Sequence, residues 1–225
     1  MKNLTLENIA KACKGVYVGS EEMKEREVQG IVTDSRKAEE GFLFVPIKGA
    51  RVDAHDFIDS VMEKGALCTL TEKDLGKKSF PYIKVHSSLQ AVKDIAEFYL
   101  KQLDIPVVGI TGSVGKTSTK EMIAAVLEQK YNVLKTKGNF NNELGVPLTV
   151  FGLRPEHEIA VLEMGISDFG ENAPAGKNCP AGYLCDHKYR FVSFGIFEIQ
   201  RWYIKGKDRN FRLLGARWAR CAERG

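Results

Sequence analysis

The first hundred or so residues alternate between short apolar runs and segments with apolar residues at helical spacing. Three segments predict helices, because their apolar residues recur every three to four positions; they begin after Thr5, at Asp53 and after Ser87. Four runs rich in β-branched or aromatic residues predict strands: Val28–Val32, Phe42–Val45, Ala66–Leu70 and Tyr82–Val85. We therefore expect residues 1–103 to form a small α/β unit with its own core.

The pattern changes after Asp104-Ile105-Pro106, which we interpret as a hinge. The run Val107–Ile110 is apolar throughout, as in a parallel strand that is buried on both faces. A glycine-rich turn follows, and then a predicted helix, strand, helical turn and strand at Thr117–Gln129, Tyr131–Leu134, Val146–Phe151 and Ile159–Glu163. This order is typical of a doubly wound nucleotide-binding domain. The predicted fold class is α/β, with a truncated P-loop parallel sheet at residues 104–171.

The strongest chemical signal is the glycine-rich turn between the buried strand and its helix. It consists of Thr111, Gly112, Ser113, Val114, Gly115, Lys116, Thr117 and Ser118. Glycines let backbone N–H groups turn toward phosphate oxygens, a lysine reaches the outer phosphates, and a hydroxyl can hold Mg²⁺. The turn therefore predicts a nucleotide site, although Ile110 stands where the general pattern has its first glycine. The alternative is a βα turn that binds nothing.

Two further polar features follow this turn in the sequence. Glu163 ends the last predicted strand, at the edge where an open α/β sheet collects ligand groups, so it can hold a metal. A solvated strand-end carboxylate is an equally good interpretation. The amides of Gly138–Asn142 can hold phosphate and substrate oxygens. The residues alone favour a simple turn, because Asn tolerates left-handed conformations.

Together these motifs resemble the central domain of the Mur ligases. The resemblance rests on Thr111–Ser118, Gly138–Pro147 and Glu163-Met164-Gly165, in that order. Three earlier motifs resemble the uridine-nucleotide-binding domain of the same family: Thr33–Arg36, Phe42–Gly49 and Asp53–Phe57. Within the family, Asn139–Asn142 and the Glu-Met-Gly run match the member that adds D-alanyl-D-alanine. Ala54 stands where the family often has glycine, a mild departure.

The resemblance implies ATP-dependent amide synthesis in peptidoglycan assembly. UDP-N-acetylmuramoyl-tripeptide and D-alanyl-D-alanine would be joined through an acyl phosphate, and the protein would mainly position groups and neutralise charge. The resemblance makes Lys116, Asn142 and Glu163 the catalytic residues: Lys116 holds the β and γ phosphates, and Asn142 positions the phosphate end. It also makes Thr117 and Glu163 the Mg²⁺ ligands. The UDP-linked substrate would be contacted by Asp34, Ser35, Arg36 and Asn141.

The composition changes near residue 171. The 225 residues include 33 Lys and Arg against 29 Asp and Glu, but residues 172–225 hold 11 against four, with nine of the 21 aromatic residues. A chain that is 44% hydrophobic and 28% charged is an ordinary globular protein. The basic, aromatic tail would suit a nucleic-acid or membrane module. Because it lacks a convincing periodicity, we expect neither a nucleic-acid partner nor a membrane span.

We interpret residues 172–225 as a frameshifted tail without homology to the family. Back-translating Cys185–Phe197 and removing one nucleotide gives V-I-T-N-I-G-S-C-H-L-E-F, and the same shift at Ile204–Phe211 gives L-K-A-K-T-E-I-F. Both resemble the family's continuation, and the nucleotide sequence near residue 171 tests this hypothesis. Family members carry a metal-binding His, a Lys and a third domain beyond this point. We therefore expect a poorly specified tail and a truncated ligase without turnover; a non-catalytic nucleotide- or UDP-sugar-peptide-binding fragment and another Mur paralogue are the alternatives.

The remaining features concern the cellular compartment. The five cysteines form no CxxC pair, so we expect free thiols without a catalytic role. The first residues lack the basic and apolar regions of a signal peptide, and no apolar run is long enough to span a membrane. We expect a cytoplasmic monomer.

Overall fold

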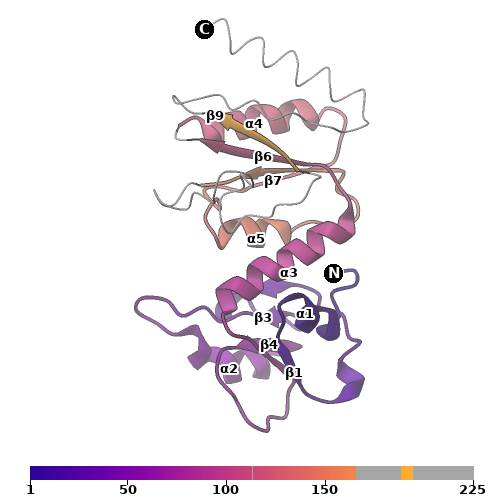
Figure 1. The fold of residues 1–225 in the computed structure, drawn as a ribbon, viewed down its shortest axis with the longest axis vertical. Coiled ribbons are helices and arrows are strands. Elements are labelled where there is room, and N and C mark those ends of the chain that lie inside the picture. Colours follow the sequence, from indigo (N-terminus) through magenta and orange to yellow (C-terminus); the bar gives the residue numbers. More distant parts are fainter. Residues whose placement is uncertain (113, 166–188, 195–225) are drawn as a thin grey trace, which may run out of the picture.

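The structure, a computed structural model, describes residues 1–112, 114–165 and 189–194, with only the backbone for the last segment. The described residues form two α/β units stacked along the long axis, with helix α3 (Ser88–Leu103) between them (Figure 1). One unit contains a five-stranded sheet and the other a four-stranded sheet. The predicted α/β class, with a small first unit before a parallel sheet, is confirmed.

The first unit is built on a sheet with the strand order β1-β5-β4-β3-β2. Its strands are β1 (Val16–Val18), β2 (Ile31–Val32), β3 (Leu43–Phe44), β4 (Cys68–Thr71) and β5 (Tyr82–Lys84). Neighbouring strands from β2 to β5 are parallel, whereas β1 runs antiparallel to β5. The four predicted strands are therefore present, all of them shorter than predicted, and β1 is an addition that the sequence pattern did not predict.

The helices of this unit begin close to their predicted caps. They are α1 (Leu6–Ala12), α2 (Ile58–Glu63) and the 3-10 turns η1 (Glu21–Met23), η2 (Ser35–Lys37) and η3 (Ala54–Phe57). The Thr5 hydroxyl accepts the Asn8 N–H at 3.2 Å and caps α1, and Ser87 caps α3 in the same way. The helix predicted from Asp53 starts instead as η3, because Asp53 Oδ1 accepts the His55 N–H at 3.0 Å and closes a tighter turn.

The second sheet has the order β7-β8-β6-β9, and all its strands are parallel. Its strands are β6 (Val107–Gly112), β7 (Val133–Lys135), β8 (Ile159–Glu163) and β9 (Tyr189–Phe194). Helix α4 (Lys116–Leu127) lies on one face and α5 (Gly145–Val150) on the other (Figure 1). The predicted strand–turn–helix–strand order is confirmed, and β8 has the predicted bounds.

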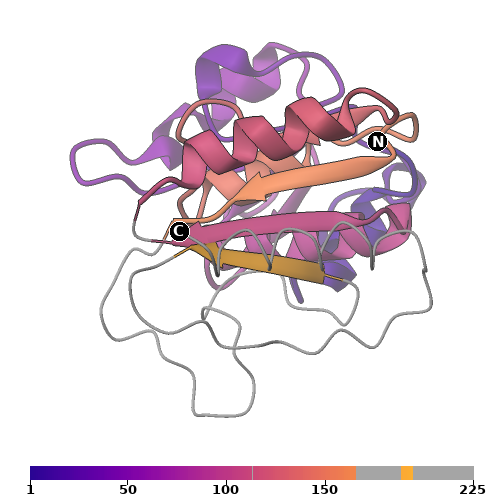
Figure 2. The same ribbon diagram turned by 90° about the horizontal axis from the view of Figure 1, so that it is seen from above.

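Strand β9 comes from the segment that we interpret as a frameshifted tail. Its backbone pairs with β6 along Val107–Gly112, and it runs beside β6 at the edge of the sheet (Figure 2). This strand was not predicted. The rest of residues 172–225 lies outside the described residues.

One hydrophobic core joins the two units through α3. The buried side chains of α3, among them Val92, Ile95 and Tyr99, belong to the same cluster as Val146 and Val150 of α5. The Tyr99 hydroxyl donates to the Leu153 carbonyl at 2.8 Å. The hinge predicted at Asp104-Ile105-Pro106 is a three-residue connection between α3 and β6, with Asp104 at φ 50°. Among the described residues, no helix is long and apolar enough to cross a membrane.

Candidate functional site

The glycine-rich turn, Thr111–Ser118, runs from the last two residues of β6 into the first turn of α4. Gly115 caps α4 with φ +77°, a left-handed conformation that glycine adopts without strain. Lys116 is the first residue of the helix, and the side chains of Thr117 and Ser118 are exposed in its first turn. The predicted phosphate turn therefore ends on a helix N-terminus, where backbone N–H groups are available to an anion. Ser113 lies outside the described residues.

Thr111 adds a second polar group to this turn. Of the described residues, Thr111 is one of two with a buried side-chain oxygen that lacks a hydrogen-bond partner; the other is Ser88. Buried hydroxyls normally have a partner. An unsatisfied hydroxyl within a phosphate-type turn fits a site that is completed by a polar ligand.

Glu163 is buried beside the start of α4. It is 1% exposed, and the Thr117 hydroxyl lies 3.0 Å from its Oε2 and 3.2 Å from its Oε1. The solvated strand-end carboxylate considered from the sequence is therefore wrong. The two residues predicted as metal ligands, which are far apart in the sequence, are in direct contact.

The pairing of β6 with β8 explains why this contact forms. Glu163 is in register with Ile110, the residue before the glycine-rich turn, and the Met164 N–H donates to the Ile110 carbonyl at 2.8 Å. The carboxyl ends of both parallel strands therefore lie at one edge of the sheet, where β6 continues two residues further, to Gly112.

The Asn-rich segment, Gly138–Asn142, contacts Glu163 on one side and the start of α5 on the other. Asn141 Nδ2 donates to Glu163 Oε1 at 2.8 Å, and the Asn141 carbonyl accepts the Gly165 N–H at 2.6 Å. Asn142 Oδ1 accepts the Gly145 N–H at 2.7 Å and the Leu144 N–H at 3.3 Å. The oxygen of Asn142 is thus occupied by backbone groups at the start of α5, whereas Asn141, predicted to contact substrate, touches the carboxylate.

Two buried residues of the site were not identified from the sequence. Lys120 is 1% exposed, and its Nζ lies 3.7 Å from Glu163 Oε2. Thr136, also 1% exposed, accepts the Glu163 N–H with its Oγ1 at 2.9 Å. Lys120 could have been found from its spacing, because it lies one helical turn after Thr117 and therefore on the same face of α4. No local signal marks Thr136.

Asp34, Ser35 and Arg36 lie in the first unit, directly after β2. Asp34 Oδ1 accepts the Arg36 N–H at 3.0 Å, and its Oδ2 lies 2.8 Å from Arg36 Nη2. The hydrogen bonds from the Arg36 side chain, and then from its backbone, lower the pKa of Asp34 to about 2. These three predicted residues form one local structure, which belongs to a different sheet from the glycine-rich turn.

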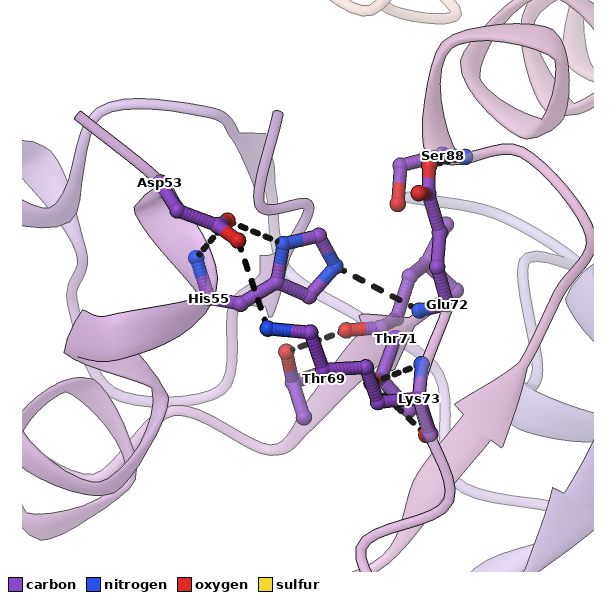
Figure 3. Close-up of polar contacts among 8 residues, drawn as sticks. Asp53, His55, Thr69, Thr71, Glu72, Lys73 and Ser88 are labelled. Atoms are coloured by element: carbon purple, nitrogen blue, oxygen red, sulfur yellow. Dashed lines mark hydrogen bonds and ion pairs between the residues drawn. The ribbon is translucent and has the colours of Figure 1, made fainter. Parts of the chain in front are cut away.

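A second polar cluster in the first unit surrounds His55 (Figure 3). The His55 Nδ1 lies 2.6 Å from Asp53 Oδ1, and its Nε2 accepts the Glu72 N–H at 3.3 Å. Lys73 Nζ donates to the other oxygen of Asp53 at 3.3 Å, and Glu72 Oε1 accepts the Ser88 N–H at 2.7 Å. These bonds fasten η3 to the end of β4 and to the start of α3, so we interpret the cluster as structural.

The comparison with known families agrees with this geometry. Residues 27–131 match the Mur ligase family, catalytic domain, and residues 110–181 match the Mur ligase middle domain. This chain belongs to the Mur ligase family. Mur ligases are ATP-dependent ligases. The middle-domain match extends beyond the boundary that we predict at residue 171, and the domain bounds remain predictions.

The named relatives of this Mur ligase chain share one description. UDP-N-acetylmuramoyl-tripeptide–D-alanyl-D-alanine ligase of Bacillus subtilis is 43% identical over 169 residues, covering 74% of this chain and 37% of that protein. The Escherichia coli protein of the same name is 43% identical over 146 residues, covering 65% and 32%. The chain thus spans about a third of the length of these curated relatives.

Solved structures of MurF are also similar to this chain. MurF from Acinetobacter baumannii is similar with a TM-score of 0.67 and 34% identity, covering 74% of this chain and 36% of that one. MurF ligase from Thermotoga maritima in complex with ADP has a TM-score of 0.59 and 38% identity, covering 64% and 33%. The two units of this Mur ligase chain therefore have counterparts in experimentally determined structures.

Proposed function

We propose that this chain carries the nucleotide-binding and UDP-substrate-binding parts of a ligase that adds D-alanyl-D-alanine to UDP-N-acetylmuramoyl-tripeptide. The contact between Thr117 and Glu163 at the end of a glycine-rich turn carries the proposal. It gives the turn a carboxylate partner from a neighbouring strand, which a turn that binds nothing does not need. The names of the curated relatives support the choice of substrates.

The nucleotide would lie over the start of α4. Thr111–Ser118 would surround the phosphates of ATP, with Lys116 at the β and γ phosphates. The hydroxyl of Thr117 donates its hydrogen to Glu163, which leaves its lone pairs for Mg²⁺, and hydroxyl and carboxylate oxygens are ligands that Mg²⁺ prefers. ATP bound there would supply the phosphoryl group that activates the substrate carboxylate as an acyl phosphate.

Other residues would orient the UDP-linked substrate and the site walls. The exposed Arg36, held by Asp34 next to Ser35, offers donors to the uridine nucleotide. Asn141 would hold the carboxylate of Glu163 in place in addition to contacting the substrate. Asn142 would act on the phosphate end through α5, whose first N–H groups it caps. A monomer in the cytoplasm belongs to the same proposal.

A second candidate function is nucleotide or UDP-sugar-peptide binding without ligation. It is favoured by the unsatisfied hydroxyl of Thr111 and by the contact between Thr117 and Glu163, since both concern the nucleotide site alone. Phosphate release separates the two. Release that requires ATP, UDP-muramoyl-tripeptide and D-alanyl-D-alanine together indicates a ligase; ATP binding without such release indicates a binding fragment.

Lys116→Ala tests the nucleotide site itself. We expect it to abolish ATP binding measured by calorimetry, because the lysine would neutralise the outer phosphates. Lys130→Ala is the matched control, since it removes a lysine just beyond the far end of α4. Equal ATP affinity in the wild type and in Lys116→Ala would show that the turn does not hold phosphates.

A further inference from the structure

Lys120 is a buried cation beside the proposed nucleotide site. Its side chain is 1% exposed although it lies on a helix that covers the outer face of the sheet. Burial of an ammonium group is unfavourable unless it is paired. The partners of Lys120 therefore indicate why a lysine occupies this position.

Lys120 pairs with two carboxylates of different exposure. Its Nζ lies 3.7 Å from Oε2 of the buried Glu163 and 3.1 Å from Oε1 of the half-exposed Glu121. The other oxygen of Glu121 lies 2.9 Å from Lys135 Nζ, which also reaches Glu128 at 3.3 Å. Charges of alternating sign thus extend from the buried Glu163 through Lys120 and Glu121 to the surface.

The backbone of Glu163 is fixed without Lys120. Its N–H donates to the Thr136 hydroxyl, and strand β8 pairs on both sides, with β6 and β7. Only the carboxylate remains to be oriented. Asn141 donates to Oε1, Lys120 faces Oε2, and the Thr117 hydroxyl is within reach of both oxygens.

We propose that Lys120 is a positioning residue, whose ammonium holds the Glu163 carboxylate in the orientation that the Thr117 hydroxyl and a bound metal–nucleotide require. The proposal rests on the proposed nucleotide site. Its chemistry is that of an outer partner of a metal ligand, which orients the ligand without touching the metal. Lys120 acts through Glu163 and contacts no phosphate in this proposal.

The test measures how Mg²⁺ strengthens the binding of a fluorescent ADP analogue to the full chain. Lys120→Met keeps an unbranched side chain of nearly the same length and removes its charge. We expect it to raise the Mg²⁺ concentration for half-maximal strengthening by about 10-fold or more, as for other outer partners of metal ligands. Binding of the analogue in EDTA should change by less than about twofold. Lys135→Met is the matched control, because it removes the next lysine of the same charge network without touching Glu163.

A double-mutant cycle distinguishes positioning from a general effect on structure. In a Glu163→Gln background, Lys120→Met should have no further effect on the Mg²⁺ response, because the residue through which it acts has been changed. Equal effects in both backgrounds, or equal effects of Lys120→Met and Lys135→Met, would overturn the proposal. If Lys120→Met does not fold, Lys120→Arg decides: a response within about threefold of wild type supports the proposal, and a lost response in folded protein overturns it. Absence of analogue binding by the wild type would instead overturn the proposed function.

Discussion

Replacing Thr136 with valine tests whether the backbone of Glu163 is held from the end of β7. Thr136 is buried, and its hydroxyl accepts the Glu163 N–H at 2.9 Å. Valine keeps the size and branching of the side chain but leaves this N–H without an acceptor. An unsatisfied buried donor costs about 1–3 kcal/mol. We therefore expect the free energy of unfolding to fall by about 2 kcal/mol.

Urea unfolding followed by far-ultraviolet circular dichroism measures this loss. Thr149→Val is the control, because its hydroxyl donates to the Gly145 carbonyl within the same helix at 2.9 Å, a type of bond that contributes little. The control should stay within about 0.5 kcal/mol of wild type. If both variants lose the same free energy, the hydroxyl of Thr136 does not hold Glu163 and the reasoning is wrong.

Two further predictions concern the first unit. Burial raises the pKa of the Cys13 thiol to about 11 and also raises the pKa of Cys68, so neither should react with iodoacetamide at about pH 8 until urea is added; peptide mapping that finds either one labelled in the native protein contradicts this. The backbone N–H of His55, and then its ring, lower the pKa of Asp53 from 3.8 to about 2. The carboxylate therefore contributes stability that is complete above the unfolded-state pKa and is lost as the pH falls toward 2. The difference in urea midpoint between wild type and Asp53→Asn should therefore shrink as the pH falls from 3.8 toward 2. A difference that stays constant would show that the pKa of Asp53 is not lowered by His55.

Local signals predicted the parts of the fold that depend on neighbouring residues. Thr5 and Ser87 cap helices because a hydroxyl three residues before a free N–H is a local arrangement. Strand β1 could not be predicted in this way, since it has three residues, Val16 is 64% exposed, and its strand conformation depends on pairing with β5. The length of a strand likewise depends on its partners, which explains why the four predicted strands of the first unit are all shorter than predicted.

In the candidate site, too, the sequence predicted what depends on neighbouring residues and missed what depends on contacts between distant ones. The turn at Thr111–Ser118 was found because its residues are contiguous and follow a buried strand. The position of Glu163 followed from the rule that parallel strands end at one edge, but its burial did not, because burial depends on Thr117, Asn141 and Lys120 closing around it. Thr136 was missed because its role comes from one bond across strands.

The backbone pairing of strand β9 does not decide the reading frame of the segment that forms it. Tyr189–Phe194 is rich in aromatic and β-branched residues, which favour an extended strand beside an open parallel edge. Pairing of this kind uses backbone N–H and C=O groups, which every residue except proline carries. The strand is therefore compatible with a native segment and with an out-of-frame one, and the nucleotide sequence near residue 171 remains the test of the reading frame.

Glu163 joins segments that the sequence keeps far apart. Helix α4 brings Thr117 and Lys120 to its carboxylate, and the Asn-rich segment brings Asn141. The residue after this segment is paired with α3, since Glu143 Oε2 lies 2.9 Å from Lys93 Nζ. Helix α3 also packs into the core of the first unit. The carboxylate of Glu163 is therefore connected, through these contacts, to the unit that would hold the UDP-linked substrate. The orientation of Glu163 therefore depends on both units and not on the phosphate turn alone.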